Sequence, residues 1–314
     1  MQLIRPDINI NFLEMRKKAL TFSAVVLLLS LGLIIFKGLN LGIDFTGGTL
    51  VEVRFHKQVE IADIRQSIEP LGYGKAVIQE FGSPTDILIR VQNQADVESS
   101  VISTGVLDAL GNHFGPDQVE MRRVEFVGPQ VGEELKTAGF MAVLYTLIGI
   151  LVYVMFRFKL RFALGADAAL MHDIIIVVGV FSLFDIEFSL SVVAALLTVL
   201  GYSLNDTIVV FDRIRENFDA NKKKKHPEDE VIVCNQSINQ TLARTLMTSL
   251  TTLLVVFSLY FFGGEVIHDF AFALIVGIAV GTYSSIFIAT PIMLSLEGKF
   301  EMSDEELKEL EERP

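Results

Sequence analysis

Six runs of about 20 mostly apolar residues decide what this chain can fold into. The hydrocarbon core of a bilayer is about 30 Å thick, and a helix that rises about 1.5 Å per residue crosses it in about 20 residues. Hydrophobic residues make up 51% of the chain, which is typical of a bundle of membrane spans. The sequence therefore predicts six transmembrane helices, at residues 20–36, 138–156, 162–184, 188–211, 240–262 and 269–296.

The first apolar run follows Arg16, Lys17 and Lys18, as the core of a signal peptide would. However, it is longer than a usual signal core, and no small-residue cleavage pattern follows it. We therefore expect it to be an uncleaved membrane anchor.

Lysine and arginine residues gather on one side of the predicted spans. Residues 1–19 and 212–239 are rich in them, as is the connection after the second span, whereas residues 185–187 and 263–268 contain none. Short loops rich in Lys and Arg remain in the cytoplasm. We therefore expect both termini, including the tail at residues 297–314, to be cytoplasmic.

Residues 37–137 lie between the first two spans and are long enough to cross the membrane whatever their charge. Their apolar alternation predicts the order βαββαβ, the split βαβ arrangement of a ferredoxin-like α+β fold. One span, an inserted domain and five further spans is also the plan of each half of an RND-type transporter. The predicted strands are residues 49–55, 76–81, 87–91 and 119–127, and the predicted helices are residues 61–71 and 97–114.

Several polar and charged residues fall inside the predicted spans. A charge near the centre of a bilayer costs at least about 2.5 to 3.5 kcal/mol, so each such residue needs a partner or a function. In the third, fourth and fifth spans these residues are Asp167, His172, Asp173, Tyr202, Asn205, Asp206, Gln240 and Arg244.

Asp206 and Arg244 are expected to form an ion pair. Asp206 lies about 7.5 Å above the cytoplasmic end of its predicted helix, and Arg244 lies a similar distance above the start of the next helix. Protonation of the carboxylate would release the guanidinium, so the pair has two charge states. Because Asn205, Tyr202 and Gln240 share the same helix faces, we expect an ion or proton relay here. The alternative is a static ion pair that only fixes helix register.

Asp173 has two interpretations that the sequence leaves open. It lies midway along its span beside His172, where it either joins the relay or accepts a hydrogen bond from a neighbouring hydroxyl. Asp167 is nearer the cytoplasmic end and is expected to be solvated or paired with Arg161 or Arg157.

The sixth span carries Gly277, Gly281 and Ser285 at four-residue spacing. Small residues at this spacing allow two helices to approach closely. Static packing is the commoner use of such a surface, although a sliding contact would also suit a transporter.

Composition excludes several function classes. A formal net charge of −12 opposes binding to nucleic acid, and the single cysteine, Cys234, cannot form an intrachain disulfide.

No zinc, nucleotide or serine-hydrolase motif is present, so we expect no metal, no cofactor and no enzymatic activity. A protease dyad of Asp173 and Asp206 is disfavoured, because Arg244 would hold both carboxylates ionised.

Motifs distributed along the chain resemble those of one known family, SecF. One motif follows the first span and contains Asp44, Gly47 and Gly48, and another leads into the second span. The resemblance extends over nearly the whole chain. The matching segments are residues 42–49, 126–129, 169–173, 201–210 and 241–245.

The resemblance implies an obligate partner, SecD, in the bacterial inner membrane. Together the two would use the proton or sodium gradient to help unfolded secretory polypeptides leave the SecYEG channel on the periplasmic side, with YajC and YidC as ancillary partners. It also implies that residues 37–137 are periplasmic and that Asp206 and Arg244 take part in ion conduction. The alternative is an RND-type exporter half that acts on small molecules or lipids.

Overall fold

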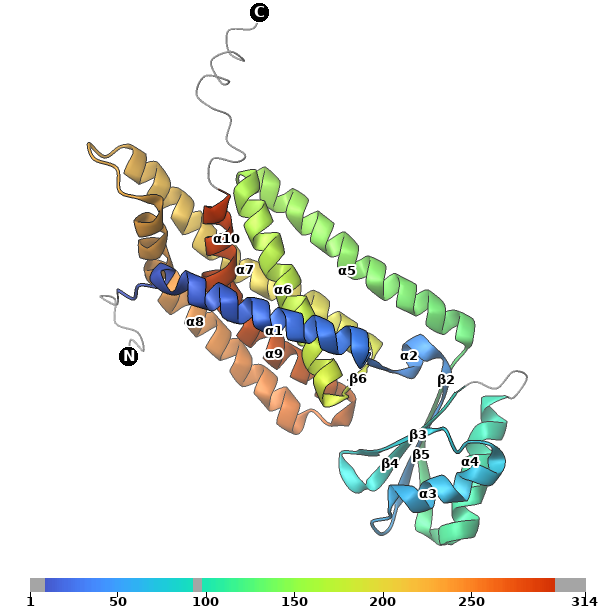
Figure 1. Ribbon diagram of the computed structural model, residues 1–314. Helices are drawn as coiled ribbons and strands as arrows, with labels where there is room; N and C mark the ends of the chain where they lie inside the picture. The colour runs from blue at the N-terminus through green and yellow to red at the C-terminus, as the bar shows by residue number, and fades with distance from the viewer. Residues whose placement is uncertain (1–8, 93–97, 297–314) are drawn as a thin grey trace, which may run out of the picture.

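The computed structural model describes residues 9–92 and 98–296. It contains a bundle of long helices and, beyond one end of the bundle, a small α+β domain (Figure 1). Six helical segments of the described chain are long and apolar enough to cross a membrane, as predicted.

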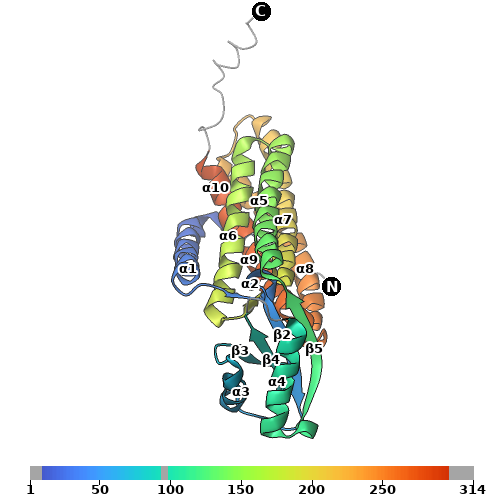
Figure 2. The same ribbon diagram turned by 90° about the vertical axis from the view of Figure 1, so that its right-hand side faces the viewer.

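Six long helices form the bundle: α1 (Arg16–Phe36), α5 (Pro129–Arg157), α6 (Leu160–Phe184), α7 (Leu190–Lys222), α8 (Glu230–Phe262) and α9 (His268–Ser284). In α6, α7 and the segment that contains α9, at least half of the most apolar 18-residue stretch is buried inside the protein. In α1, α5 and α8 the buried share is 17% or less. The first three are therefore central. The other three lie around them, as Figure 2 shows for α1, α5 and α8. Their exposed leucines and phenylalanines suit contact with lipid.

The helices α7 and α8 extend well beyond the apolar runs that predict them. Each has 33 residues, so most of the connection expected at residues 212–239 is helical. Beyond the predicted ends of the spans, Ile214 and Phe218 of α7 and Val233 and Ile238 of α8 are buried in one shared core. Packing between the two helices therefore continues their helical structure into a region where the chain is too polar to resemble a membrane span.

The last span is interrupted near its end. A five-residue π-helix, Ser285–Ala289, follows α9 and leads into α10 (Thr290–Ser295). Pro291 lacks the N–H that an α-helix would use at this position, so the regular hydrogen-bond pattern cannot continue unchanged through the segment.

Close packing joins α9 to α7. A methyl group added at Gly281 would lie 2.9 Å from Cβ of Ser203, and one at Gly277 would overlap the side chain of Val199. The prediction of close helix approach is therefore confirmed for Gly277 and Gly281, which bring α7 against α9 at the level of Ser203.

The α+β domain has the predicted ferredoxin-like topology. Its four strands pair antiparallel in the order β3-β4-β2-β5, with α3 and α4 on one face (Figure 2). Isoleucines and valines of β2 and β4 and of both helices form its buried core. Its elements are β2 (Gly48–Phe55), α3 (Ile61–Ile68), the 3-10 turn η2 (Glu69–Leu71), β3 (Val77–Phe81), β4 (Ser83–Val91), α4 (Ser99–Phe114) and β5 (Val119–Val127).

Candidate functional site

Asp173 lies fully buried where three helices meet. Its Oδ2 atom accepts hydrogen bonds from Ser203 of α7 at 2.6 Å and Ser284 of α9 at 2.8 Å, and its Oδ1 atom is 3.0 Å from Nδ1 of His172. Of the two interpretations of Asp173, hydrogen bonding to hydroxyls is therefore the one that the contacts support directly. The carboxylate links all three central helices.

Asp206 is a second buried carboxylate, on α7, with 2% of its surface exposed. It accepts hydrogen bonds from Ser249 at 3.3 Å and, weakly, from Thr248 at 3.5 Å, both on α8. Ser249 in turn lies 2.7 Å from the hydroxyl of Thr282 on α9. Hydroxyl groups of α8 thus contact this carboxylate, and one of them links it to α9.

Among the described residues no salt bridge joins Asp206 and Arg244, so the predicted direct ion pair is not formed, although the charge of Arg244 still acts on the carboxylate. Arg244 is exposed and lines a cavity of about 480 Å³ between α7 and α8, whereas Asp206 faces inward. The depth argument placed both residues on consecutive helices at similar heights, but depth does not fix the direction in which each side chain points around its helix axis.

Asn205 and Gln240 also belong to this outer cavity and not to the surroundings of Asp206. Gln240 accepts hydrogen bonds from Arg213 at 2.6 Å and from Asn217 at 3.0 Å. The polar residues predicted as one cluster therefore divide into an inner group around the buried carboxylates and an outer group that opens on the surface of the chain.

Several buried polar atoms near the two carboxylates have no hydrogen-bond partner in the described part of the chain. Buried polar atoms in folded proteins are nearly always satisfied by protein or by ordered water, so such atoms mark places where water or an ion can bind. They are Oη of Tyr202, Oγ1 of Thr207, Oγ1 of Thr245, Nε2 of His172 and Oδ1 of Asp167.

Asp167 does not form either of its expected ion pairs among the described residues. Arg161 binds Glu230 at 2.9 Å, and Arg157 binds Asp212 at 3.0 Å. Both arginines are thus engaged by acidic residues of α7 and α8 that the sequence did not single out.

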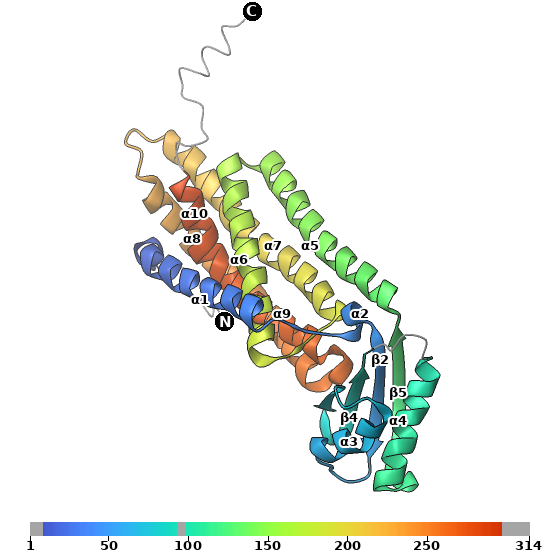
Figure 3. The ribbon, with the colours of Figure 1, turned by 45° about the vertical axis from the view of Figure 1, so that its right-hand side comes forward.

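The motif with Asp44, Gly47 and Gly48 lies at the junction of the two domains (Figure 3). Asp44, in the short helix α2 (Ile43–Thr46), accepts a hydrogen bond at 2.8 Å from the backbone N–H of Leu190, the first residue of α7. Gly48 has a φ of +137°, and a Cβ there would lie 2.7 Å from the carbonyl oxygen of Val91. The motif therefore caps the helix that carries Asp206.

A buried arginine that the sequence analysis missed ties the α+β domain to the bundle. Arg90 of β4 donates hydrogen bonds to the Leu41 carbonyl at 3.2 Å and to Asn40 at 3.1 Å, and it lies 3.4 Å from Glu187. Its partners belong to the parallel pair β1 (Asn40–Leu41) and β6 (Glu187–Phe188). Burial raises the pKa of Glu187, and the Arg90 charge opposes that rise.

Comparison with known proteins decides the family. The model of the protein export membrane protein SecD/SecF C-terminal region matches residues 106–299, and the SecD/SecF GG motif matches residues 32–59. The chain belongs to the SecD/SecF protein-export family. The paired glycines of that motif are Gly47 and Gly48, which adopt positive φ at the domain junction.

Individual SecF proteins are similar over almost their full length. Protein translocase subunit SecF of Magnetococcus marinus is 51% identical over 95% of both chains, and that of Vibrio alginolyticus is 49% identical over 94% of this chain and 92% of its own. The crystal structure of SecDF from Thermus thermophilus, described as a translocon-associated membrane protein, superposes with a TM-score of 0.83 at 40% identity. It matches 94% of this chain, which spans only 40% of that one.

Proposed function

We propose that this SecF-family chain works with SecD as an ion-driven unit that assists protein export through SecYEG. The observation that carries the proposal is Asp206, a carboxylate in a membrane span with 2% exposure, whose hydrogen-bond donors among the described residues are the hydroxyls of Thr248 and Ser249. A buried carboxylate without a direct ion pair is costly inside a membrane span, so a group that gains and loses a proton or a sodium ion with the gradient accounts for it better than a static lock does.

Access for the ion is proposed from the end of the bundle that faces the α+β domain. A cavity of about 190 Å³ lies there, and its charged lining consists of Arg123, which lies 3.2 Å from Glu125, and the carboxylates Asp44, Glu125, Glu187, Glu265 and Asp269. Carboxylates concentrate cations at the mouth of a path. From this mouth the ion would pass the orphaned polar atoms around the inner carboxylates.

The outer cavity that holds Asn205 and Arg244 is proposed as the contact with SecD. Arg244 is exposed and forms no ion pair with the described residues, so it is free to meet an acidic group of a second subunit. Support comes from the SecDF structure, in which this chain corresponds to only part of a longer polypeptide. Asp206 and Arg244 would then belong to one relay through the partner.

The gradient supplies enough free energy to move such an assembly. One charge that crosses a membrane potential of 100 mV yields about 2.3 kcal/mol, which changes the ratio of two conformations by about 50-fold. We propose that the α+β domain is periplasmic, that both termini are cytoplasmic and that the domain acts on an unfolded secretory polypeptide. YajC and YidC are proposed as further partners, and no enzymatic step is involved.

The test compares Asp206→Asn with Asp219→Asn in inner-membrane vesicles that contain SecD and SecYEG. Asp219 lies on the same helix but is exposed and lines neither of the two cavities, so its replacement removes the same charge outside the proposed path. Export of a secretory precursor is measured with a proton gradient alone, a sodium gradient alone and neither. We expect Asp206→Asn to abolish only the gradient-dependent part, and the effective gradient identifies the ion. Unchanged gradient-driven export at normal protein level would instead favour a passive scaffold.

A further inference from the structure

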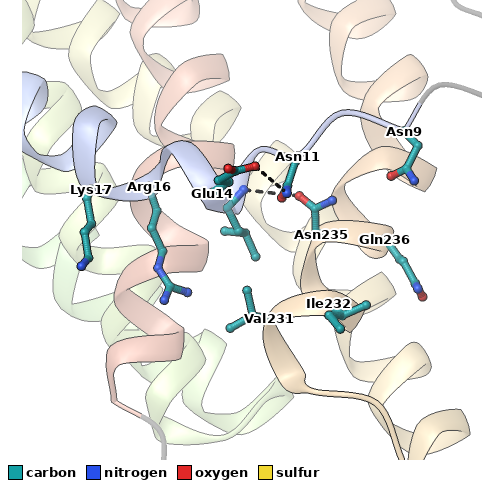
Figure 4. Close-up of a pocket in the computed structure, with 10 residues that line it drawn as sticks. Asn9, Asn11, Glu14, Arg16, Lys17, Val231, Ile232, Asn235 and Gln236 are labelled. Atoms are coloured by element: carbon teal, nitrogen blue, oxygen red, sulfur yellow. Dashed lines mark hydrogen bonds between the residues drawn. The ribbon is translucent and has the colours of Figure 1, made fainter.

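The N-terminal segment of the described chain lies across the first turns of α8 and forms part of the wall of an open cavity of about 620 Å³ (Figure 4). The cavity lies at the start of the first span, on the side of the bundle that carries the Lys- and Arg-rich connections. It is separate from both carboxylate sites. Its lining residues include two cations, four carboxamides and the apolar side chains of Leu13, Val231 and Ile232.

Hydrogen bonds hold the segment above the cavity in place. The Ile10 carbonyl accepts from Asn235 at 3.0 Å and from Asn239 at 2.8 Å, and the Ile10 N–H donates to Asn239 at 2.8 Å. Farther along, Phe12 and Leu13 are buried in the core of the bundle. Segment and helix are thus fixed to each other, so the cavity is a built feature of the fold.

The cavity has unmatched positive charge. Among the described residues neither Arg16 nor Lys17 forms an ion pair, and in Figure 4 both side chains extend to the same side of the N-terminal ribbon, with Arg16 reaching toward Val231. The only carboxylate among the described lining residues, Glu14, accepts a hydrogen bond from Asn11 at 2.9 Å. Two cations against one engaged carboxylate leave a net charge of +1.

Three acidic residues of the described chain that flank the cavity lining are already engaged, and one of them, Asp229, accepts a hydrogen bond from the Val231 N–H at 2.7 Å. Glu230 binds Arg161 at 2.9 Å, and Glu228 binds Lys224 at 2.6 Å and accepts from Gln236 at 3.0 Å. These groups therefore do not neutralise the cations of the cavity. An anion bound from outside the protein can neutralise them.

Apolar surface continues from the cavity toward the lipid-facing side of α1. Ile232 at its edge is 50% exposed, and on α1 and just before it Met15 and Phe22 are 43% and 63% exposed. A ligand with a phosphate group and hydrocarbon chains would satisfy both parts of the surface. We propose that this cavity binds the phosphate group of an anionic phospholipid, with Arg16 and Lys17 as its ligands and the carboxamides as further donors.

The test measures retention of phosphatidylglycerol by the purified full-length chain in detergent, using native mass spectrometry over a lipid titration. Arg16→Gln and Lys17→Gln are compared with Lys18→Gln, which removes the same charge from the adjacent exposed position outside the cavity. Each cation near a membrane surface changes anionic-lipid affinity by about fivefold. We expect that loss for Arg16→Gln and Lys17→Gln, less than a twofold change for Lys18→Gln, and recovery in Arg16→Lys.

Three outcomes would overturn the proposal. Equal losses in all three glutamine variants would mean diffuse attraction to the basic surface. Equal retention of phosphatidylcholine would remove the requirement for a net negative lipid. Displacement of phosphatidylglycerol by millimolar inorganic phosphate would identify a free-anion site in place of a lipid site. Circular dichroism of each variant confirms that the helical fold is kept.

Discussion

Replacing Asp173 tests whether this carboxylate holds the three central helices together. In Asp173→Ala, Ser203, Ser284 and His172 all lose their shared partner. A hydrogen bond between membrane helices contributes about 0.6 kcal/mol on average and up to about 1.7, so the loss of three lowers the free energy of unfolding by about 2 to 5 kcal/mol. Packing losses would add to this value.

Asp173→Asn is the matched control, because it keeps the shape of the side chain. Its carboxamide oxygen can accept from both serines, and its NH₂ group can donate to Nδ1 of His172. We therefore expect a loss below about 1 kcal/mol.

Both variants are measured by reversible unfolding of the full-length chain in mixed micelles. If Asp173→Asn destabilises the protein as much as Asp173→Ala does, the hydrogen bonds from the two serines do not stabilise the packing of the helices, and the proposed structural role of Asp173 is refuted. If both variants are as stable as the parent chain, the carboxylate has no structural role. Export measured on a stable Asp173→Asn variant then reports the effect of removing titration alone.

Three further predictions concern the α+β domain and its junction with the bundle. Gly48→Ala should lower the free energy of unfolding by about 1 to 3 kcal/mol, since Gly48 has a φ of +137° and the carbonyl oxygen of Val91 occupies the position of a Cβ atom. In thermal unfolding the control is Gly32→Ala, because the space around Gly32 is open. Asp44→Ala should cost about 1 kcal/mol through loss of the helix cap, and Asp44→Asn less, in the same assay. Hydrogen bonds from Arg54 hold the pKa of Asp86 below its usual value, so its stabilising contribution is present above the unfolded-state pKa and is lost as pH falls through the folded-state pKa. Unfolding midpoints at pH 7 and pH 3 should therefore differ less in Asp86→Asn than in the parent chain.

The spans and the α+β domain could be predicted because each is encoded in local periodicity. Apolar runs of about 20 residues identify lipid-crossing helices, and two-residue alternation identifies strands. The ends of α7 and α8 could not be predicted in this way. Ile214 and Val233 continue these helices by packing against one another outside the apolar runs, and a contact between helices leaves no mark in a hydropathy profile.

The candidate site was predicted in its residues but not in its arrangement. Asp173 and Asp206 stood out because carboxylates in apolar runs are rare, and both are buried. The predicted direct contact of Asp206 with Arg244 is not formed, because a residue's height along a helix can be inferred from the sequence more reliably than the direction in which its side chain points. The contacts of Asp44 with α7 and of Arg90 with β1 join segments distant in sequence, and no local pattern signals them.

The capped start of α7 has a mechanical consequence. This helix is one uninterrupted element of 33 residues, about 50 Å long, with Asp206 near its middle and the glycine motif at its first residue. Because a helix resists compression along its axis, a lengthwise displacement of α7 under the proposed function would act on Asp44 of α2 through the hydrogen bond from Leu190. From α2 it would reach β2 and the sheet through Gly47 and Gly48. The proposed function therefore makes this pair of glycines the mechanical link between the bundle and the α+β domain.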